Sequence, residues 1–414
     1  MIIVLLTLGY ILQYNPYFLS EYLWKHYWTG STIRTAISLS CLAPSLLLTS
    51  FSGIRLRRGP FIISLGMALT GVYGLCLGSI FNAESKYVVA DSIIWFETAA
   101  YLLLLGSISY EAVIKLLRVI ITYSILSNLV SLGLFWSLRE EIAVAALIGG
   151  ERVVRLVDLQ APLILILLYL KALNFSRTVI IFGTLVLVQV IFLGLFRSVW
   201  AALILAIITN FIVYPRLLLR KRVLGFLGIS LGLIFAFEWV YYHLTDVNSV
   251  LLGRVIAGIG TEDSEGRVSS TVDVISQFVD NPIRMLIGNG FGAMAWFVND
   301  FGDGEVRAFQ PVGSLSNYLV ALVFQIGVIW FLVVLLPLFL GAVRFWRSSH
   351  IEVRRILLVL MSYIVFQWLT FPSHIHFPTA MTLAAGMALL GYVPRLQQYC
   401  SCQFDHPASR RSPM

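Results

Sequence analysis

The stretch PFIISLGMALTGVYGLCLGSIF, residues 60–81, contains no charged side chain. As an α-helix it is long enough to cross the hydrocarbon core of a bilayer, which is roughly 30 Å thick. Comparable apolar stretches recur along the 414-residue chain, which is 59% hydrophobic and only 12% charged. A soluble domain could not bury that much apolar surface, because its outside must carry polar groups that meet water. The sequence therefore predicts an all-α polytopic membrane protein.

Apolar windows predict about twelve transmembrane helices. They lie near residues 1–19, 33–51, 60–81, 87–108, 112–136, 155–171, 178–196, 198–214, 223–242, 313–341, 355–371 and 376–393. The first has no basic residues before it and no small-residue cleavage site after it, so we expect it to be retained as a span. The expected organisation is a bundle, a long loop, a second bundle and a tail, at residues 1–242, 243–312, 313–394 and 395–414.

Basic residues are concentrated in every second connection between these spans. This set begins with RLRR at 55–58, includes RLLLRKR at 216–222 and holds most of the 29 Lys and Arg residues. Cytoplasmic loops carry such an excess. We therefore expect both termini in the cytoplasm, and the loop 243–312 on the non-cytoplasmic face of the membrane. Because the charges follow the membrane orientation, the net charge of +8 does not indicate a nucleic-acid partner.

The loop 243–312 is expected to be a folded, partly helical cap. It holds nine of the chain's 21 carboxylates. Within it, VSSTVDVISQFV at 268–279 has the apolar spacing of a helix, with Ser269 or Ser270 as the N-cap. The Asp-Asn-Pro at 280–282 should end this helix, because the residue before a proline disfavours the helical conformation.

Arginines on the predicted non-cytoplasmic side are the main candidates for chemistry. Arg197 stands between two apolar spans. A guanidinium in such a place usually faces a cavity or a partner, although it can also reach to the lipid headgroups. Arg152 and Arg155 could bind a ligand, but Glu151 and Asp158 could equally neutralise them.

Arg267 and a glycine-rich run offer two further candidates in the cap. Arg267 has Glu262, Asp263 and Glu265 as sequence neighbours. It could form a salt bridge with one of them, or it could bind a phosphate, which a guanidinium matches with paired, planar hydrogen bonds. The run IGNGFGA, residues 287–293, could bring backbone amides toward an anion, or it could form a tight turn that packs the cap.

Histidine is scarce, and two of the six histidines stand close together. His374 and His376, in FPSHIHFP, lie on the connection between the last two predicted spans. Either could act as a general base or bind a substrate, or both could pack at headgroup level. Because no Cys or carboxylate cluster accompanies them in the sequence, no metal site is expected.

Three stretches, in this order along the chain, resemble the O-antigen polymerase and O-antigen ligase superfamily (Wzy-type polymerases and their relatives). RSVWAALILAIITNFIVYPRLLLRKR, 197–222, resembles the family's span that starts with an Arg and ends in a basic cytoplasmic loop. GRVSSTVDVISQFVDNPIRMLIGNGFGAM, 266–294, resembles its outer-loop pattern of Arg, helix, Pro and glycine-rich turn. SLSNYLVALVFQIGVIWFLVVL, 314–335, resembles its polar entry into a span that contains a Gly.

The resemblance implies a metal-independent, GT-C-type glycosyltransferase without a cofactor. Its substrate would be an undecaprenyl-diphosphate-linked oligosaccharide, joined into polymer at the periplasmic face of the bilayer, with a chain-length regulator as a further expected partner. By this resemblance Arg197 and Arg267 take the positions of arginines that hold the donor diphosphate. His374 is a candidate base, together with Asp263 and Glu265.

Other residues are expected to contact the substrate: Arg152, Arg155, Arg254, Arg284, Ser316 and Asn317. Many ligases of the superfamily have a His directly before the Asn of the third stretch, where Ser316 stands here. This departure favours a polymerase and leaves the base unassigned. The alternatives are ligase-type transfer of the glycan to another acceptor, and transport of a lipid-linked oligosaccharide or another solute.

Overall fold

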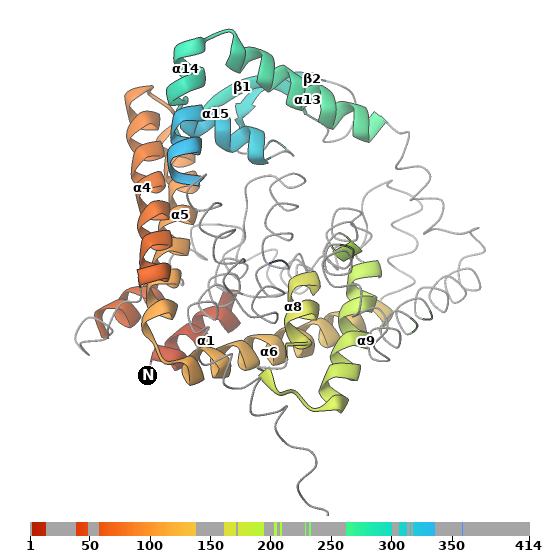
Figure 1. Ribbon diagram of the computed structural model, residues 1–414. Coiled ribbons are helices and arrows are strands. Elements are labelled where there is room, and N and C mark those ends of the chain that lie inside the picture. The colour runs from red at the N-terminus through yellow and green to blue at the C-terminus, as the bar shows by residue number, and fades with distance from the viewer. Residues whose placement is uncertain are drawn as a thin grey trace, which may run out of the picture.

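The fold is described from a computed structural model of the chain. It describes residues 2–13, 39–48, 58–137, 161–170, 173–193, 262–299, 306–312 and 318–335, with residues 203, 204, 208, 228, 232, 315 and 358. Its labelled helices are α1 (Ile2–Gln13), α4 (Arg58–Ile80), α5 (Ser85–Ser107), α6 (Tyr110–Ser137), α8 (Ala161–Leu168), α9 (Arg177–Leu193), α13 (Glu262–Val279), α14 (Pro282–Ile287) and α15 (Tyr318–Trp330). Two strands, β1 (Met294–Asn299) and β2 (Val306–Pro311), and a π-helical turn, η4 (Phe331–Leu335), complete the set (Figure 1).

Three helices in this part of the chain are long and apolar enough to cross a membrane. They cover Pro60–Ile80 in α4, Ser85–Ser107 in α5 and Tyr110–Gly133 in α6, close to three of the predicted spans. Shorter apolar helices at Ile2–Ile11, Leu39–Leu48, Arg177–Ile191 and Leu319–Val334 overlap four others. The described residues are thus mainly helical, as expected for a membrane protein, while the total of about twelve spans stays a prediction.

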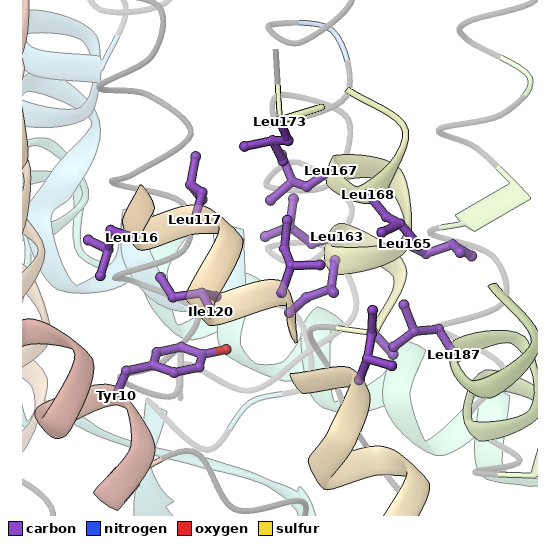
Figure 2. Close-up of a cluster of buried hydrophobic side chains, with 14 of the residues drawn as sticks. Tyr10, Leu116, Leu117, Ile120, Leu163, Leu165, Leu167, Leu168, Leu173 and Leu187 are labelled. Carbon is purple, nitrogen blue, oxygen red and sulfur yellow. The ribbon is translucent and has the colours of Figure 1, made fainter. Parts of the chain in front are cut away.

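One hydrophobic core, here called the bundle core, is formed mainly by α1, α6, α8 and α9. Figure 2 shows leucines of α6 and α8 filling its centre, with the ring of Tyr10 at one side. The Tyr10 hydroxyl lies 2.9 Å from Ser124 Oγ, and the Tyr123 hydroxyl donates to the Ile11 carbonyl at 3.2 Å. These polar contacts, with the edge-on packing of the Tyr10 and Tyr123 rings, fix α1 against α6.

Arg118, near the start of α6, joins this bundle to the connection between α8 and α9. Its guanidinium donates to the carbonyls of Leu173 at 2.6 Å and Asn174 at 2.9 Å. These carbonyls follow the end of α8, where backbone oxygens lack helical partners and attract cations.

Helices α4 and α5 form an antiparallel pair that lies side by side in Figure 1. The Ser64 hydroxyl donates to the Ala99 carbonyl at 2.7 Å. A side chain at Gly71 would meet the ring of Phe96, and one at Gly106 would meet Pro60. Small residues at these crossings let the two backbones approach, which is the usual basis of helix association in membranes.

A second core, here called the cap core, lies where α13, the hairpin β1–β2 and α15 pack on one end of α4 and α5 (Figure 1). The prediction of a helix that ends before Pro282 is confirmed, since α13 stops at Val279 and Asn281 caps α14. The prediction of Ser269 or Ser270 as its N-cap is wrong. The helix begins at Glu262, and both serines lie inside it.

The hairpin corrects the expectation of an all-α fold. β1 and β2 pair antiparallel, with Trp296 opposite Phe309 and Phe297 opposite Ala308. Ala295 and Phe297 point into the cap core, while Trp296 and Phe309 are exposed on the other face. The Gln277 side chain of α13 pairs with the backbone of Trp296, accepting from its N–H at 3.0 Å and donating to its carbonyl at 2.6 Å. α13 thereby covers backbone groups at the edge of β1 that β2 leaves unpaired.

Candidate functional site

The glycine-rich run predicted at 287–293 forms a turn that leads from α14 to β1, against α4 and α15. Gly288, Gly290 and Gly292 have φ values of 93°, 83° and 72°. This region of backbone space is costly for residues with a Cβ. There is also no room for one: a Cβ at Gly290 would overlap the backbone of Gly78, and one at Gly288 would overlap the Gln325 carbonyl. Glycine is therefore required here by both conformation and space.

The backbone amides of this turn are occupied by the protein itself. Asn289 N donates to the Phe324 carbonyl at 3.0 Å and Gly290 N to the Gln325 carbonyl at 2.8 Å. Phe291 N donates to the Gly74 carbonyl at 2.9 Å, and Gly292 N donates to the Asp91 carboxylate at 3.0 Å. An anion site needs amides that point at the ligand. Of the two readings of this run, the structure supports the tight packing turn.

Phe291 is the side chain that seats the turn on α4. It is fully buried, its ring fills the space that a side chain at Gly74 would take, and its backbone carbonyl fills the space that one at Gly78 would take. These two glycines stand one helical turn apart, in the small-xxx-small spacing that often receives a second transmembrane helix. Here the groove receives a turn of the cap instead. Trp95 of α5 stacks on the other side, with ring centroids 6.4 Å apart.

The apolar stretch predicted as one span at 313–341 is interrupted at Gly327, which has a φ of 74°. In an unbroken helix the carbonyls of Phe324 and Gln325 would accept from amides four residues later. Here they accept from the glycine turn. Non-helical backbone of this kind is tolerated in an apolar setting only where other protein groups satisfy it. The single-helix expectation is therefore wrong, and the reason is a tertiary contact.

Asp91 joins α5, the glycine turn and α15 by hydrogen bonds. Its Oδ2 accepts from Gly292 N at 3.0 Å and from the Gln325 side-chain amide at 2.7 Å. It stands in the second turn of α5, while its partners belong to the glycine turn and to α15. Hydrogen bonds to a charged acceptor are stronger than neutral ones. Asp91 is therefore a positioning residue for the cap.

Arg284 is the predicted substrate-binding residue whose side chain the structure describes. It is exposed on α14, with its guanidinium 4.8 Å from the centroid of the Phe81 ring and Nη1 donating to Asn289 Oδ1 at 3.3 Å. No carboxylate among the described residues forms an ion pair with it. Among the described residues, most of its five N–H donors have no partner and are available to an anion at the C-terminal end of α4.

The other predicted site residues lie on α13 or outside the described residues. Arg267 belongs to α13, about one and a half turns after the helix begins. The remaining ones lie outside the described residues: Arg197, His374, Arg152, Arg155, Arg254, Ser316 and Asn317. In the part of the chain that is described, no three His, Cys, Asp or Glu side chains gather as a metal site would require.

Sequence reasoning missed the polar residues inside the spans. Asp91 and Gln325 hold the cap, and Glu97 is buried at 7% exposure in the middle of α5. A carboxylate inside an apolar span is costly and usually has a function, so each was a usable signal. The glycine pair at 74 and 78 was a second signal, for close packing.

Comparisons of the chain with models of known protein families, with curated proteins and with solved structures found no match.

Proposed function

We propose that this protein is a polytopic glycosyltransferase of the bacterial inner membrane that polymerises undecaprenyl-diphosphate-linked oligosaccharides. The proposal includes about twelve spans, both termini in the cytoplasm and an active face in the periplasm. It takes its substrate class from the sequence resemblance. One structural observation carries it: an arginine without an acidic partner among the described residues, at the rim where a folded cap closes on two candidate spans.

The chemistry suits such a rim. In polymerisation an acceptor hydroxyl attacks the anomeric carbon of the donor sugar, and a glycosidic bond forms as the bond to the diphosphate oxygen breaks. The diphosphate leaves with the electron pair, and the hydroxyl proton passes to a base. Negative charge therefore grows on phosphate oxygens in the transition state, where a fixed guanidinium stabilises it. A cation–π contact with Phe81 and a hydrogen bond to Asn289 restrict the position of the Arg284 guanidinium.

Purified protein in detergent, given a lipid-linked oligosaccharide repeat, should produce a ladder of longer lipid-linked products. Arg284→Ala should lower the rate roughly 100-fold, the typical cost of losing one donor to a developing oxyanion. Arg284→Lys should recover part of the loss, because charge remains but the paired geometry does not. Arg267→Ala should likewise remove the ladder.

Lys86→Ala is the matched control, since Lys86 is also an exposed cation on this rim but is paired with Glu84 at 2.9 Å. Full activity in Arg284→Ala would make Arg284 a packing residue and remove this support. Transfer to a lipid A core without chain extension would identify a ligase.

A transporter is the second candidate, and the break in α15 favours it. Discontinuous apolar helices hold substrates and ions in many secondary transporters. In this chain, however, the freed carbonyls of Phe324 and Gln325 are taken by the glycine turn. Glycan extension in detergent needs no sealed membrane, so a strict requirement for closed vesicles would favour transport instead.

A further inference from the structure

The corner where α13 meets α14 exposes three large apolar side chains. Val279, Ile283 and Leu286 are 57%, 69% and 42% exposed. On the other face of α13, Val274 and Phe278 are buried in the cap core. The cap has therefore already buried one apolar face, and this second group is left outside it.

The depth of this corner follows from its contacts with α4. The candidate span Pro60–Ile80 has 21 residues. At 1.5 Å per residue it is about as long as the hydrocarbon core is thick, which places Ile80 near the outer edge. The backbone of Phe291, just after α14, bonds to Gly74, and the Tyr73 hydroxyl donates to the Ile287 carbonyl at 2.6 Å.

The N-terminal end of α14 lies closer to the C-terminal end of α4. Its Arg284 stands over Phe81, the first residue beyond the candidate span, with 4.8 Å between the guanidinium and the ring centroid. α14 therefore lies alongside the last two turns of α4. In a bilayer this depth is the boundary between headgroups and acyl chains.

Helix α4 also carries a surface that would face lipid. Exposed apolar residues recur along it at helical spacing: Ile62, Leu65, Leu69, Val72 and Ile80. The helix beside which α14 lies is therefore itself a candidate for contact with acyl chains over its whole length.

We infer that the α13–α14 corner is a membrane anchor of the cap, in which Val279, Ile283 and Leu286 insert into the outer leaflet of the bilayer. The occupant is phospholipid, because the corner lies at bilayer depth beside a helix with an exposed apolar face along its length. The anchor holds the Arg284 guanidinium at the depth of lipid phosphates, where cationic side chains commonly end. This inference does not depend on the proposed glycosyl transfer.

Nitroxide accessibility tests the anchor directly. Single cysteines replace Val279, Ile283 and Leu286 in a background with Cys41, Cys76, Cys400 and Cys402 changed to Ala. Each variant is spin-labelled in liposomes of phosphatidylethanolamine and phosphatidylglycerol. All three labels should show high collision rates with oxygen and low rates with a water-soluble nickel chelate. Val72→Cys provides the lipid-facing reference, Phe278→Cys the buried one and Lys86→Cys the reference exposed at the rim.

Two results would overturn the anchor. High nickel accessibility would place the corner in water, and low accessibility to both reagents would mean that another protein surface, such as a second copy, covers it. The unmodified chain gives an independent measurement. A phospholipid with a photoactivatable group near its ester should label residues 279–286 in the native protein, and absence of label there with labelling of α4 would contradict the inference.

Discussion

The bundle core and the cap core are both apolar, but different forces hold them. In the bundle core, leucine and isoleucine side chains of α6, α8 and α9 fill the space between helices. In the cap core, backbone meets backbone through glycines, and one carboxylate joins three elements. Side-chain packing loses stability gradually as volume is removed. A backbone contact has no such tolerance, so the two regions should respond differently to single substitutions.

The largest expected effect is that of Gly290→Ala. The new methyl would overlap the backbone of Gly78 at a φ of 83°. Left-handed backbone alone costs about 1–2 kcal/mol for an alanine, and the overlap adds to it. The cap should separate from α4, seen as rapid hydrogen exchange at residues 289–292. In the bundle, Gly133→Ala has open space and should leave thermal stability unchanged or higher. Equal behaviour of these two variants would end the distinction between the regions.

Asp91→Ala should come next. It leaves the Gly292 amide and the Gln325 side chain without their acceptor, at a cost of about 2–3 kcal/mol. Asp91→Asn keeps an oxygen in place but loses the charge, so it should cost about 1 kcal/mol. Thermal unfolding of the purified variants measures both. Asp280→Asn, an exposed acid at the end of α13, is the control, and the proposed tie fails if all three variants unfold alike.

Leu117→Ala tests the bundle core. Leu117 is fully buried between α6 and its neighbours. Because lipid is as apolar as leucine, the change mainly removes packing, and we expect about 2 kcal/mol, the low end of the range for soluble cores. Exchange at residues 289–292 should stay slow, since the cap lies in the other core. Simultaneous loosening of both regions would show that they unfold as one unit.

The smallest effect is expected from Gln277→Leu. It removes the two bonds to the Trp296 backbone and should cost about 1 kcal/mol. Trp296 should exchange its amide hydrogen faster, while α4 and α5 are unaffected. Ser276→Ala, a neighbouring exposed position, should change neither property. Unaltered exchange at Trp296 would mean that the hairpin does not need α13 at its edge.

Local sequence patterns predicted the extents of the long helices and the end of α13. The apolar runs of α4, α5 and α6 give the spans, and Pro282 gives the end of α13. Helix spacing and turn residues need only neighbours in sequence, which explains why these predictions hold.

The cap's architecture depends on distant partners and was not predicted in detail. The break at Gly327 is stable only because the glycine turn takes up the freed carbonyls. The hairpin forms in a stretch that carries no strong strand signal, against Gln277 and α15. Of the candidate site, the sequence identified Arg284 and the glycine run, but not Asp91, whose role appears only when its partners are known.

The seating of Phe291 on α4 also has a consequence for biogenesis. Asp91 and Gly292, which meet beside this contact, are 201 residues apart in the chain. At a synthesis rate of about 5–20 residues per second, the α4–α5 pair would wait roughly 10–40 seconds for the segment that closes its glycine groove. During that interval Gly74 and Gly78 present an unfilled notch to the lipid and to the insertion machinery. A membrane chaperone that shields small-residue grooves would have its clearest opportunity on this nascent chain there.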